Sequence, residues 1–364
     1  MRVLLLPGDR GGCGLYRMIQ PARAVANLSS DVELFTAEGL RGKSTRGRDG
    51  AVRVWSIPPI DADVVVFQRP LNDDLASVIP LVQAQGVAVV VELDDDFERV
   101  HPHNVAAPQV NPATSPHSNW EYLKQACTLA DMVTVSTQAL TRYAPHGRVR
   151  VVRNYLPVSI LNLPIIPHSN VDPVRIGWTG TLATHPDDLT VTRGAVARVV
   201  ADTGAVVQVV GNPSGVGHDL GLEVDPPSAG WVDLPHYPET IRDNLDIGIV
   251  PLGDIPFNQA KSALKGLEFA ALGKPFVASP VAEYRRLAGR GVGLLASGRK
   301  DWVRHLNMLV RSPDYREELA GSGREVVRRE FTIEAHAHEW FDAWTQALSN
   351  RDTRVSGGVR AAHR

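Results

Sequence analysis

Short apolar runs alternate with amphipathic segments along most of this 364-residue chain, and this alternation constrains the fold more than any other feature. The first run, residues 3–6, ends at Pro7-Gly8, as is typical of a buried strand that closes in a tight turn. Strands separated by helices form a parallel sheet that is covered on both faces. Strands are expected at 3–6, 32–36, 52–55, 64–68, 87–93, 132–136 and 149–152, with helices at 15–28, 71–85 and 120–130.

The alternation stops in a proline-rich stretch at 156–173 and then resumes. Later strands are expected at 174–179, 206–210, 246–251 and 275–279, and helices at 189–201, 301–310, 314–330 and 333–348. We therefore predict an α/β protein with two Rossmann-like, doubly wound parallel-sheet domains, which bind ligands at the carboxyl ends of their strands. The expected parts are a first domain at 1–155, a linker at 156–173, a second domain at 174–330, a helix at 331–349 and a disordered polar tail at 350–364.

Charge and cysteine content exclude several classes of protein. Lys and Arg number 38 against 40 Asp and Glu, and this balance disfavours a protein that coats nucleic acid. The two cysteines are too few for a disulfide framework or a four-cysteine zinc site. No apolar run reaches the roughly 18–20 residues that span a bilayer, and the first run is too short for a signal peptide. A cytoplasmic protein is expected.

Glycines are concentrated directly after the first strand, in residues 8–14 (GDRGGCG). Such a loop lets the backbone approach a ligand, and the helix that follows offers unpaired amides to an anion. Arg17 stands where a dinucleotide-binding fingerprint requires its third glycine. The loop therefore predicts ligand contact without a bound dinucleotide, and a tight strand-to-helix turn is the alternative.

Three consecutive aspartates, at 94–96, follow the most apolar predicted strand. Adjacent carboxylates raise one another's pKa, which makes Asp95 and Asp96 candidate general bases. His101 and His103 follow closely, so a metal cluster is conceivable, but the spacing matches no well-defined ligand motif and we expect no metal. A solvated acidic turn is the other interpretation.

Residues 258–273 predict a helix that ends at Gly273. At about 100° per residue, Lys261, Lys265 and Glu268 share one face of this helix. Lys261 falls in the first turn, where the helix dipole disfavours a cation and a bound phosphate would offset that cost. Glu268 lies deeper, at a position suited to accept hydrogen bonds from ribose hydroxyls. The alternative is a solvated face with a Lys–Glu pair.

A second candidate loop, residues 179–181, ends the first strand of the second half. Thr179, Gly180 and Thr181 combine hydroxyls with a glycine, which suits contact with phosphate or sugar. His185 and an Asp pair at 187–188 follow, and a turn with an aspartate helix cap is the alternative interpretation.

With these residues, the sequence resembles glycosyltransferases of the GT-B fold, in the group called family 4 or group 1. The strongest match is residues 261–279 (KSALKGLEFAALGKPFVAS), preceded by DIGIVPL at 246–252. The loop 8–14, the run IGWTG at 176–180 and the helix after Phe331 also fit. GGCGLYR and DDDF in the N-terminal block are similar to transferases of actinobacterial phages, which would place the protein in the host cytoplasm.

The resemblance implies a nucleotide-diphosphate-sugar donor, linked to UDP or GDP, on the second domain and an acceptor on the first. It also implies that no cofactor or metal is required and that the final helix crosses back to the first domain. Glu268 matches the family residue on the donor ribose, whereas Ala260 stands where the family often has a second Glu, which leaves the stereochemical outcome open. Diphosphate contacts are expected from Lys261, Lys265, Thr179, Gly180 and Thr181, and sugar or acceptor contacts from Gly11, Gly12, Gly14, Arg17 and His101.

The leading hypothesis is therefore an enzyme that transfers a hexosyl or pentosyl group to an acceptor hydroxyl, with Asp95 or Asp96 as base. A sugar-nucleotide epimerase on the same fold is an alternative. A non-catalytic nucleotide-sugar-binding protein is another, and Ala260 favours it. The acceptor is left open among a protein side chain, a glycan and a modified nucleobase, as is the oligomeric state.

Overall fold

The computed structural model describes residues 1–40, 42–166 and 173–362, and the chain divides into two compact units. Unit 1 comprises Met1–Pro102, Ala106–Asn154 and Ile333–Arg364, and unit 2 comprises His103–Val105 and Tyr155–Thr332. The stretch expected to be a linker contains the 3-10 helix η4 (Val158–Asn162), and its residues 167–172 lie outside the described residues.

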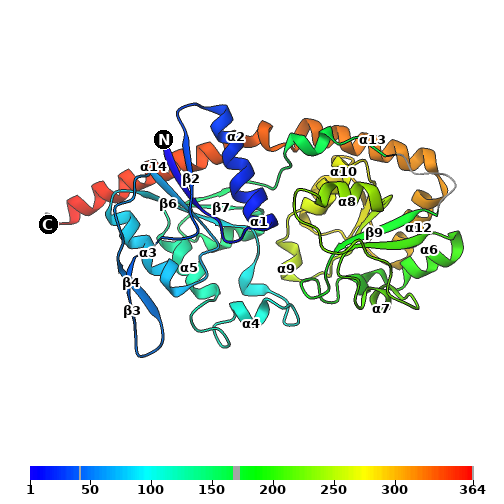
Figure 1. Ribbon diagram of the computed structural model, residues 1–364, viewed down its shortest axis with the longest axis horizontal. Helices are drawn as coiled ribbons and strands as arrows, with labels where there is room; N and C mark the ends of the chain where they lie inside the picture. Colours follow the sequence, from blue (N-terminus) through cyan, green and yellow to red (C-terminus); the bar gives the residue numbers. More distant parts are fainter. Residues whose placement is uncertain (41, 167–172, 363–364) are drawn as a thin grey trace. The chain divides into compact units, whose positions relative to one another are not determined.

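Unit 1 contains a parallel sheet of six strands in the order β2-β1-β5-β6-β7-β8 (Figure 1). The strands are β1 (Arg2–Leu6), β2 (Glu33–Thr36), β5 (Val64–Gln68), β6 (Ala88–Leu93), β7 (Met132–Val135) and β8 (Val149–Val151). Every residue of β5, β6 and β7 is buried, which explains why their sequences are mostly apolar, with one polar residue in each strand (Gln68, Glu92 and Thr134). The parallel α/β sheet predicted from the alternation is confirmed.

The segment at 52–55 was expected to add a strand to this sheet, and that expectation is wrong. Strand β4 (Val52–Ser56) instead pairs antiparallel with β3 (Lys43–Arg46) in a separate hairpin. One face of β4 packs on α3, where Ser77 accepts a hydrogen bond from the Val54 amide at 3.1 Å. The hairpin forms because its alternating sequence has one apolar face only, whereas a central parallel strand needs two.

Apart from the C-terminal α14, the helices and helical turns of unit 1 lie between its strands in the sequence. They are α1 (Gly12–Gly14), the π-helix η1 (Leu15–Ile19), α2 (Gln20–Leu28), α3 (Asp73–Ala84), η2 (Phe97–Arg99), α4 (Ala107–Val110), α5 (Trp120–Leu129), η3 (Gln138–Tyr143) and α14 (Ile333–Ala362). Helix α14 packs against α2 and contacts β6 and β7.

The polar composition after Asn350 predicted disorder, but α14 continues through this segment to Ala362. The Asn350 amide donates a hydrogen bond to the Asp131 carbonyl at 2.8 Å, and Arg354 forms an ion pair with the Asp131 carboxylate at 2.9 Å. These contacts order a segment that has little apolar surface of its own, and composition alone does not reveal them.

Unit 2 contains a second parallel sheet, with five strands in the order β10-β9-β11-β12-β13. The strands are β9 (Arg175–Gly180), β10 (Val206–Gly211), β11 (Ile247–Val250), β12 (Phe276–Ala278) and β13 (Leu294–Leu295). The helices and helical turns are η5 (Leu189–Thr192), α6 (Ala195–Thr203), α7 (Val216–Leu220), α8 (Tyr237–Asn244), α9 (Pro256–Gln259), α10 (Leu264–Ala271), α11 (Ala282–Ala288), α12 (Arg299–Arg311) and α13 (Pro313–Glu330).

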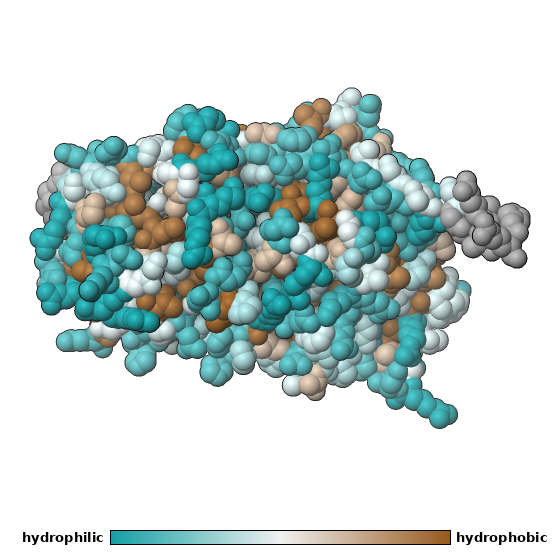
Figure 2. All heavy atoms as spheres, turned by 180° about the vertical axis from the view of Figure 1, so that it is seen from behind, coloured by the Kyte–Doolittle hydropathy of each residue, from teal (hydrophilic) through white to brown (hydrophobic). Residues whose placement is uncertain are grey.

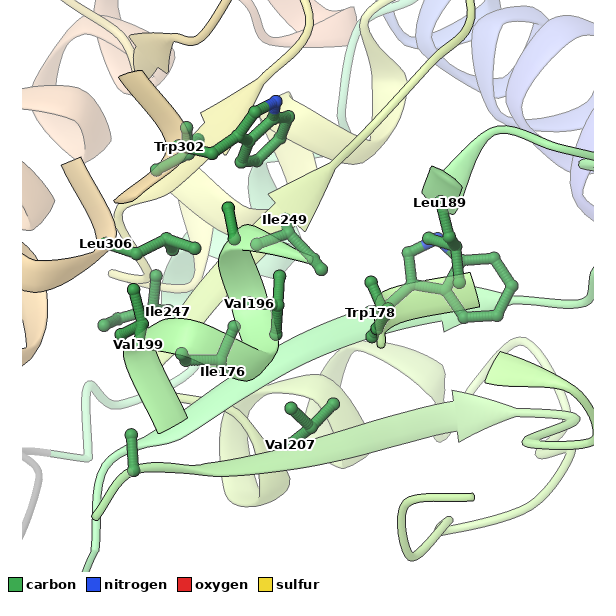
Figure 3. Packing of buried hydrophobic residues seen from close by; sticks show 14 of the residues in the cluster. Ile176, Trp178, Leu189, Val196, Val199, Val207, Ile247, Ile249, Trp302 and Leu306 are labelled. Atoms are coloured by element: carbon green, nitrogen blue, oxygen red, sulfur yellow. The ribbon is translucent and has the colours of Figure 1, made fainter. Parts of the chain in front are cut away.

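Strand β11 shows how both faces of this sheet are covered. Ile247 and Ile249 point into an apolar cluster with side chains of α6 and α12, and Figure 3 shows Trp302 and Leu306 of α12 in that cluster. The intervening Gly248 faces α10, where a Cβ would meet the Phe269 ring at 2.5 Å. Because successive strand residues point to opposite faces, helices pack on both sides, as expected for a doubly wound domain.

Each sheet has one point at which the strand order reverses. In unit 1, β2 lies on one side of β1 and β5 on the other, and in unit 2, β10 and β11 flank β9 in the same way. The loops after these flanking strands diverge, so a crevice forms at the carboxyl ends. The predicted ligand loops, 8–14 after β1 and 179–181 at the end of β9, both lie at such a point.

Among the described residues, no helix is long and apolar enough to cross a membrane. On the face drawn in Figure 2, polar residues predominate and apolar residues occur in small separate patches.

Candidate functional site

The strand reversal of unit 2 brings together residues from three parts of the chain. Thr179 is the penultimate residue of β9, Gly253 lies in the loop after β11, and Lys265 lies in the first turn of α10. The Lys265 ammonium donates a hydrogen bond to the Thr179 carbonyl at 2.8 Å and lies 3.2 Å from Nε2 of His185. It is also 5.7 Å from the centroid of the Trp178 ring. These contacts fix a cation at the carboxyl edge of the sheet.

His185 links this lysine to a buried carboxylate. Nδ1 of His185 donates to Asp188 at 3.0 Å, so Nε2 carries the lone pair that faces Lys265. Asp188 also accepts hydrogen bonds from the Gly253 amide at 2.8 Å and from the Asn258 side chain at 2.6 Å. The result is an Asp188–His185–Lys265 chain in which each group orients the next.

The electrostatics of this chain follow from burial. Burial, and then the neighbouring Lys261 charge, lower the pKa of Lys265 to about 8. Burial and the Lys265 charge lower the pKa of His185, so its imidazole is neutral. Burial opposes the charged form of Asp188, but hydrogen bonds from His185 and Gly253 outweigh it and lower the pKa of this carboxyl group. At neutral pH the chain therefore holds one carboxylate, one neutral imidazole and one ammonium.

Gly180 leaves room for the ammonium. Its φ of +133° is a conformation that side-chain-bearing residues rarely adopt. A Cβ at this position would lie 3.3 Å from Nζ of Lys265. Thr181, the next residue, stabilises the turn, because its hydroxyl accepts the Ala183 amide at 3.3 Å.

Lys261 was predicted to lie in the first turn of the same helix as Lys265, and this is wrong. The chain forms two helices, α9 and α10, and Lys261 lies between them. The cation in a first helical turn is Lys265, next to the N-cap Ala263. The Lys261 ammonium lies 4.3 Å from the centroid of the Phe257 ring, and its charge reaches Lys265.

Glu268 lies one turn along α10 from Lys265 and is buried. Its carboxylate faces Tyr237 at the start of α8, and burial and then this charge raise the pKa of the phenol above its usual range. A cavity of about 400 Å³ is present at the carboxyl ends of β11, β12 and β13. Its lining includes Leu252, Asp254, Gln259, Ser279 and Arg285.

The strand reversal of unit 1 holds a different cluster. Asp9, in the glycine-rich loop, accepts hydrogen bonds from the amides of Gly11 and Gly14 at 2.7 and 3.1 Å. These amides were predicted to face a ligand. The structure corrects this expectation, because both already donate hydrogen bonds to the Asp9 carboxylate. Asp9 also pairs with Arg69, which follows β5. A Cβ at Gly14 would lie 2.0 Å from the Asp9 carbonyl, so the loop itself requires that glycine.

Arg69 also reaches the predicted aspartate triplet, since its Nε lies 3.6 Å from Asp94. Asp96, one of the two predicted bases, is buried and pairs with Arg142, and it accepts the Tyr143 hydroxyl at 3.0 Å. Asp95 is half-buried between them. Asp96 is therefore held by Arg142 and Tyr143, which leaves Asp95 as the better candidate for an acid–base residue.

Arg17 was predicted to contact the sugar or acceptor, and the structure places it elsewhere. It is 1% exposed, and its guanidinium lies 2.7 Å from Glu92. The same group donates to the Val152 carbonyl at 2.7 Å and to Asn154 at 2.9 Å. These contacts hold the buried cation within the unit and leave it no access to a ligand.

The remaining predicted residues of unit 1 are half-buried: Gly12 is in α1, and His101 is in the loop after η2. A cavity of about 580 Å³ lies beside the glycine-rich loop, where β1 and β2 end. Its lining includes Asp9, Arg10 and Glu38, and the last two form an exposed ion pair.

Two features of the site escaped the sequence interpretation. Asp188 was weighed only as a helix cap, but its side chain bonds His185, Gly253 and Asn258 instead of capping η5. Arg69 was not singled out at all, and the positive φ of +50° that it adopts leaves no mark in the sequence.

The fold defined by these two sheets is that of the GT-B glycosyltransferases, to which similar solved structures belong. Sucrose-phosphate synthase from Thermosynechococcus elongatus has a TM-score of 0.60 at 16% identity, over 96% of this chain and 99% of that chain. HepE from Anabaena, in complex with UDP, has a TM-score of 0.57 at 14% identity, over 94% and 99%. TarM has a TM-score of 0.51 at 12% identity, over 77% and 54%. No family model matches the sequence, and no curated protein has a matching sequence.

Proposed function

We propose that this protein is a glycosyltransferase that moves a sugar from a nucleotide-diphosphate sugar to an acceptor hydroxyl. The observation that carries the proposal is the Lys265 ammonium, which is fixed at the strand reversal of unit 2 by Thr179 and His185. The GT-B fold supports the same conclusion. Because a structure of HepE contains UDP, a uridine-linked donor is the first choice over a guanosine-linked one.

Lys265 binds the donor diphosphate in this proposal, and Lys261 adds charge nearby. Sugar transfer releases a nucleoside diphosphate, so the developing negative charge needs a preorganised cation. The amides at the start of α10 and the positive end of its dipole act in the same direction. With these groups in place, no metal is required, and chelation is expected to leave activity unchanged.

Glu268 accepts hydrogen bonds from the donor ribose, and the 400 Å³ cavity beside β11 accepts the base. Gly253 connects the two regions, since its amide bonds Asp188 while its neighbour Asp254 lines that cavity. A buried carboxylate and a cavity of this size match what a nucleoside requires.

On the acceptor side, Asp95 is the proposed base, and the 580 Å³ cavity beside the glycine-rich loop is the proposed acceptor pocket. Asp95 is half-buried and lies between the buried residues Asp94 and Asp96 in the sequence, in the loop after β6. The acceptor itself, the transferred sugar, a phage source and location in a host cytoplasm stay predictions.

Ala260 favours one alternative, a nucleotide-sugar-binding protein without catalysis. It is buried where the resembling family often has an acidic residue. Turnover of donor with an acceptor panel separates the two, because a binding protein gives affinity without product. An epimerase would convert the donor with no acceptor present.

The test is calorimetric titration with UDP. Lys265→Ala is expected to weaken binding at least tenfold, because it removes a charge-assisted contact. Lys300→Ala, at an exposed lysine of α12, is the matched control and should bind like the natural protein. Equal affinity in all three proteins would refute the diphosphate assignment.

A further inference from the structure

Unit 2 has a second cavity, of about 260 Å³, at the opposite edge of its sheet. Asp246 and Pro275, which immediately precede β11 and β12, form part of its lining, so it lies at the amino ends of the strands. Lys265 lies at the carboxyl ends. The proposed donor site therefore does not include this second cavity.

Lys274 is the first unusual group in the lining. It is 3% exposed, yet across the described residues the structure records no hydrogen bond to its ammonium. Burial lowers the pKa of Lys274 to about 8, so the group still carries a proton at neutral pH. The ammonium belongs to the lining of the cavity, where a bound anion would stabilise its charge.

Arg316 of α13 is a second buried cation in the same lining, 6% exposed. One of its terminal nitrogens donates to the Leu309 carbonyl at 2.7 Å and to the Val310 carbonyl at 3.3 Å. These bonds anchor the guanidinium in the cavity wall by one nitrogen only. Its fork retains further donors of the kind that bind oxyanions.

The acidic groups of the lining do not neutralise these two cations fully. Asp246 is held by Arg175, whose Nε and Nη2 lie 2.9 and 2.8 Å from its two carboxylate oxygens. Its charge also acts on Lys274 and Arg316 and favours their charged forms, so three cations share this one carboxylate. Glu317 is exposed, so solvent screens its charge.

We propose that this cavity binds a small oxyanion, a phosphate- or carboxylate-bearing molecule, between Lys274 and Arg316. A cavity of about 260 Å³ has room for a compact anion. Ile165, Ile166 and Ala320 also line the cavity and provide an apolar surface for a short carbon skeleton.

The experiment uses the full chain and two probes, inorganic phosphate and malonate, titrated separately by calorimetry against sodium chloride of equal ionic strength. Four variants accompany the natural protein. Lys274→Met removes the buried cation, and Gly321→Leu fills the cavity without changing a charge, at a position where a Cβ meets nothing within 4 Å. Lys300→Met is the exposed control, and Lys265→Met removes the donor-site cation.

At least one probe is expected to bind saturably, with a dissociation constant at least tenfold weaker in Lys274→Met and Gly321→Leu. Binding should be unchanged in Lys300→Met and Lys265→Met, and the probe that binds identifies the head group. No saturable binding of either probe overturns the proposal. So does binding that survives Lys274→Met and Gly321→Leu, or that is lost only in Lys265→Met, which would place the anion at the donor site. The Lys265→Met variant tests only the proposed donor site. A failure of the anion-site proposal can therefore be distinguished from a failure of the proposed function.

Discussion

The pKa of Lys265 makes UDP affinity depend on pH in a way that the structure specifies. Burial and Lys261 lower this pKa to about 8, and only the protonated ammonium binds a diphosphate. Between pH 7 and pH 9 the protonated fraction of such a group falls about tenfold, equivalent to roughly 1.4 kcal/mol of binding free energy. The affinity is therefore expected to be nearly constant below pH 7 and about tenfold weaker at pH 9.

Calorimetry of UDP binding at these pH values tests this, with Lys265→Arg as the matched variant. Arginine keeps its charge throughout this pH range. The UDP affinity of the Lys265→Arg variant should therefore not show the tenfold decrease that deprotonation of the lysine causes. The protonation of UDP itself changes with pH in the same way for both proteins. The ratio of their UDP affinities therefore reports the protonation of Lys265 alone. If both proteins weaken in parallel as the pH rises, Lys265 does not hold the diphosphate.

Three further changes have expected outcomes. Gly180→Ala forces a strained φ and crowds the Lys265 ammonium, so unfolding in urea should cost about 1–3 kcal/mol less and UDP should bind more weakly; full stability and affinity would contradict this. Arg17→Met leaves Glu92 buried without its cation, and the free energy of unfolding should fall by about 3–5 kcal/mol, with partial recovery on adding Glu92→Gln. Asp95→Asn should lower turnover at least about a hundredfold with unchanged UDP affinity, and normal turnover would remove it as the base.

The sequence predicted the architecture because its signals are local. Mostly apolar runs such as 87–93 identify strands buried on both faces, and the intervening helical segments require parallel connections. The loops at 8–14 and 179–181 were also placed correctly at strand ends. Local signals were misinterpreted at β4, whose alternating sequence has a single apolar face, and at residues 256–271, which form two helices, α9 and α10, instead of one.

Tertiary structure decided which side chains meet. His185, Asp188 and Lys265 converge because β9 and β11 are neighbours at a strand reversal, and strand order depends on how the crossover helices pack. The same packing buries Arg17 against Glu92 and gives the loop amides to Asp9. Periodicity reports contacts within a few residues along the chain, whereas Lys265 and His185 are 80 residues apart and Arg17 and Glu92 are 75 residues apart, so the residue types alone carry no record of these two pairs.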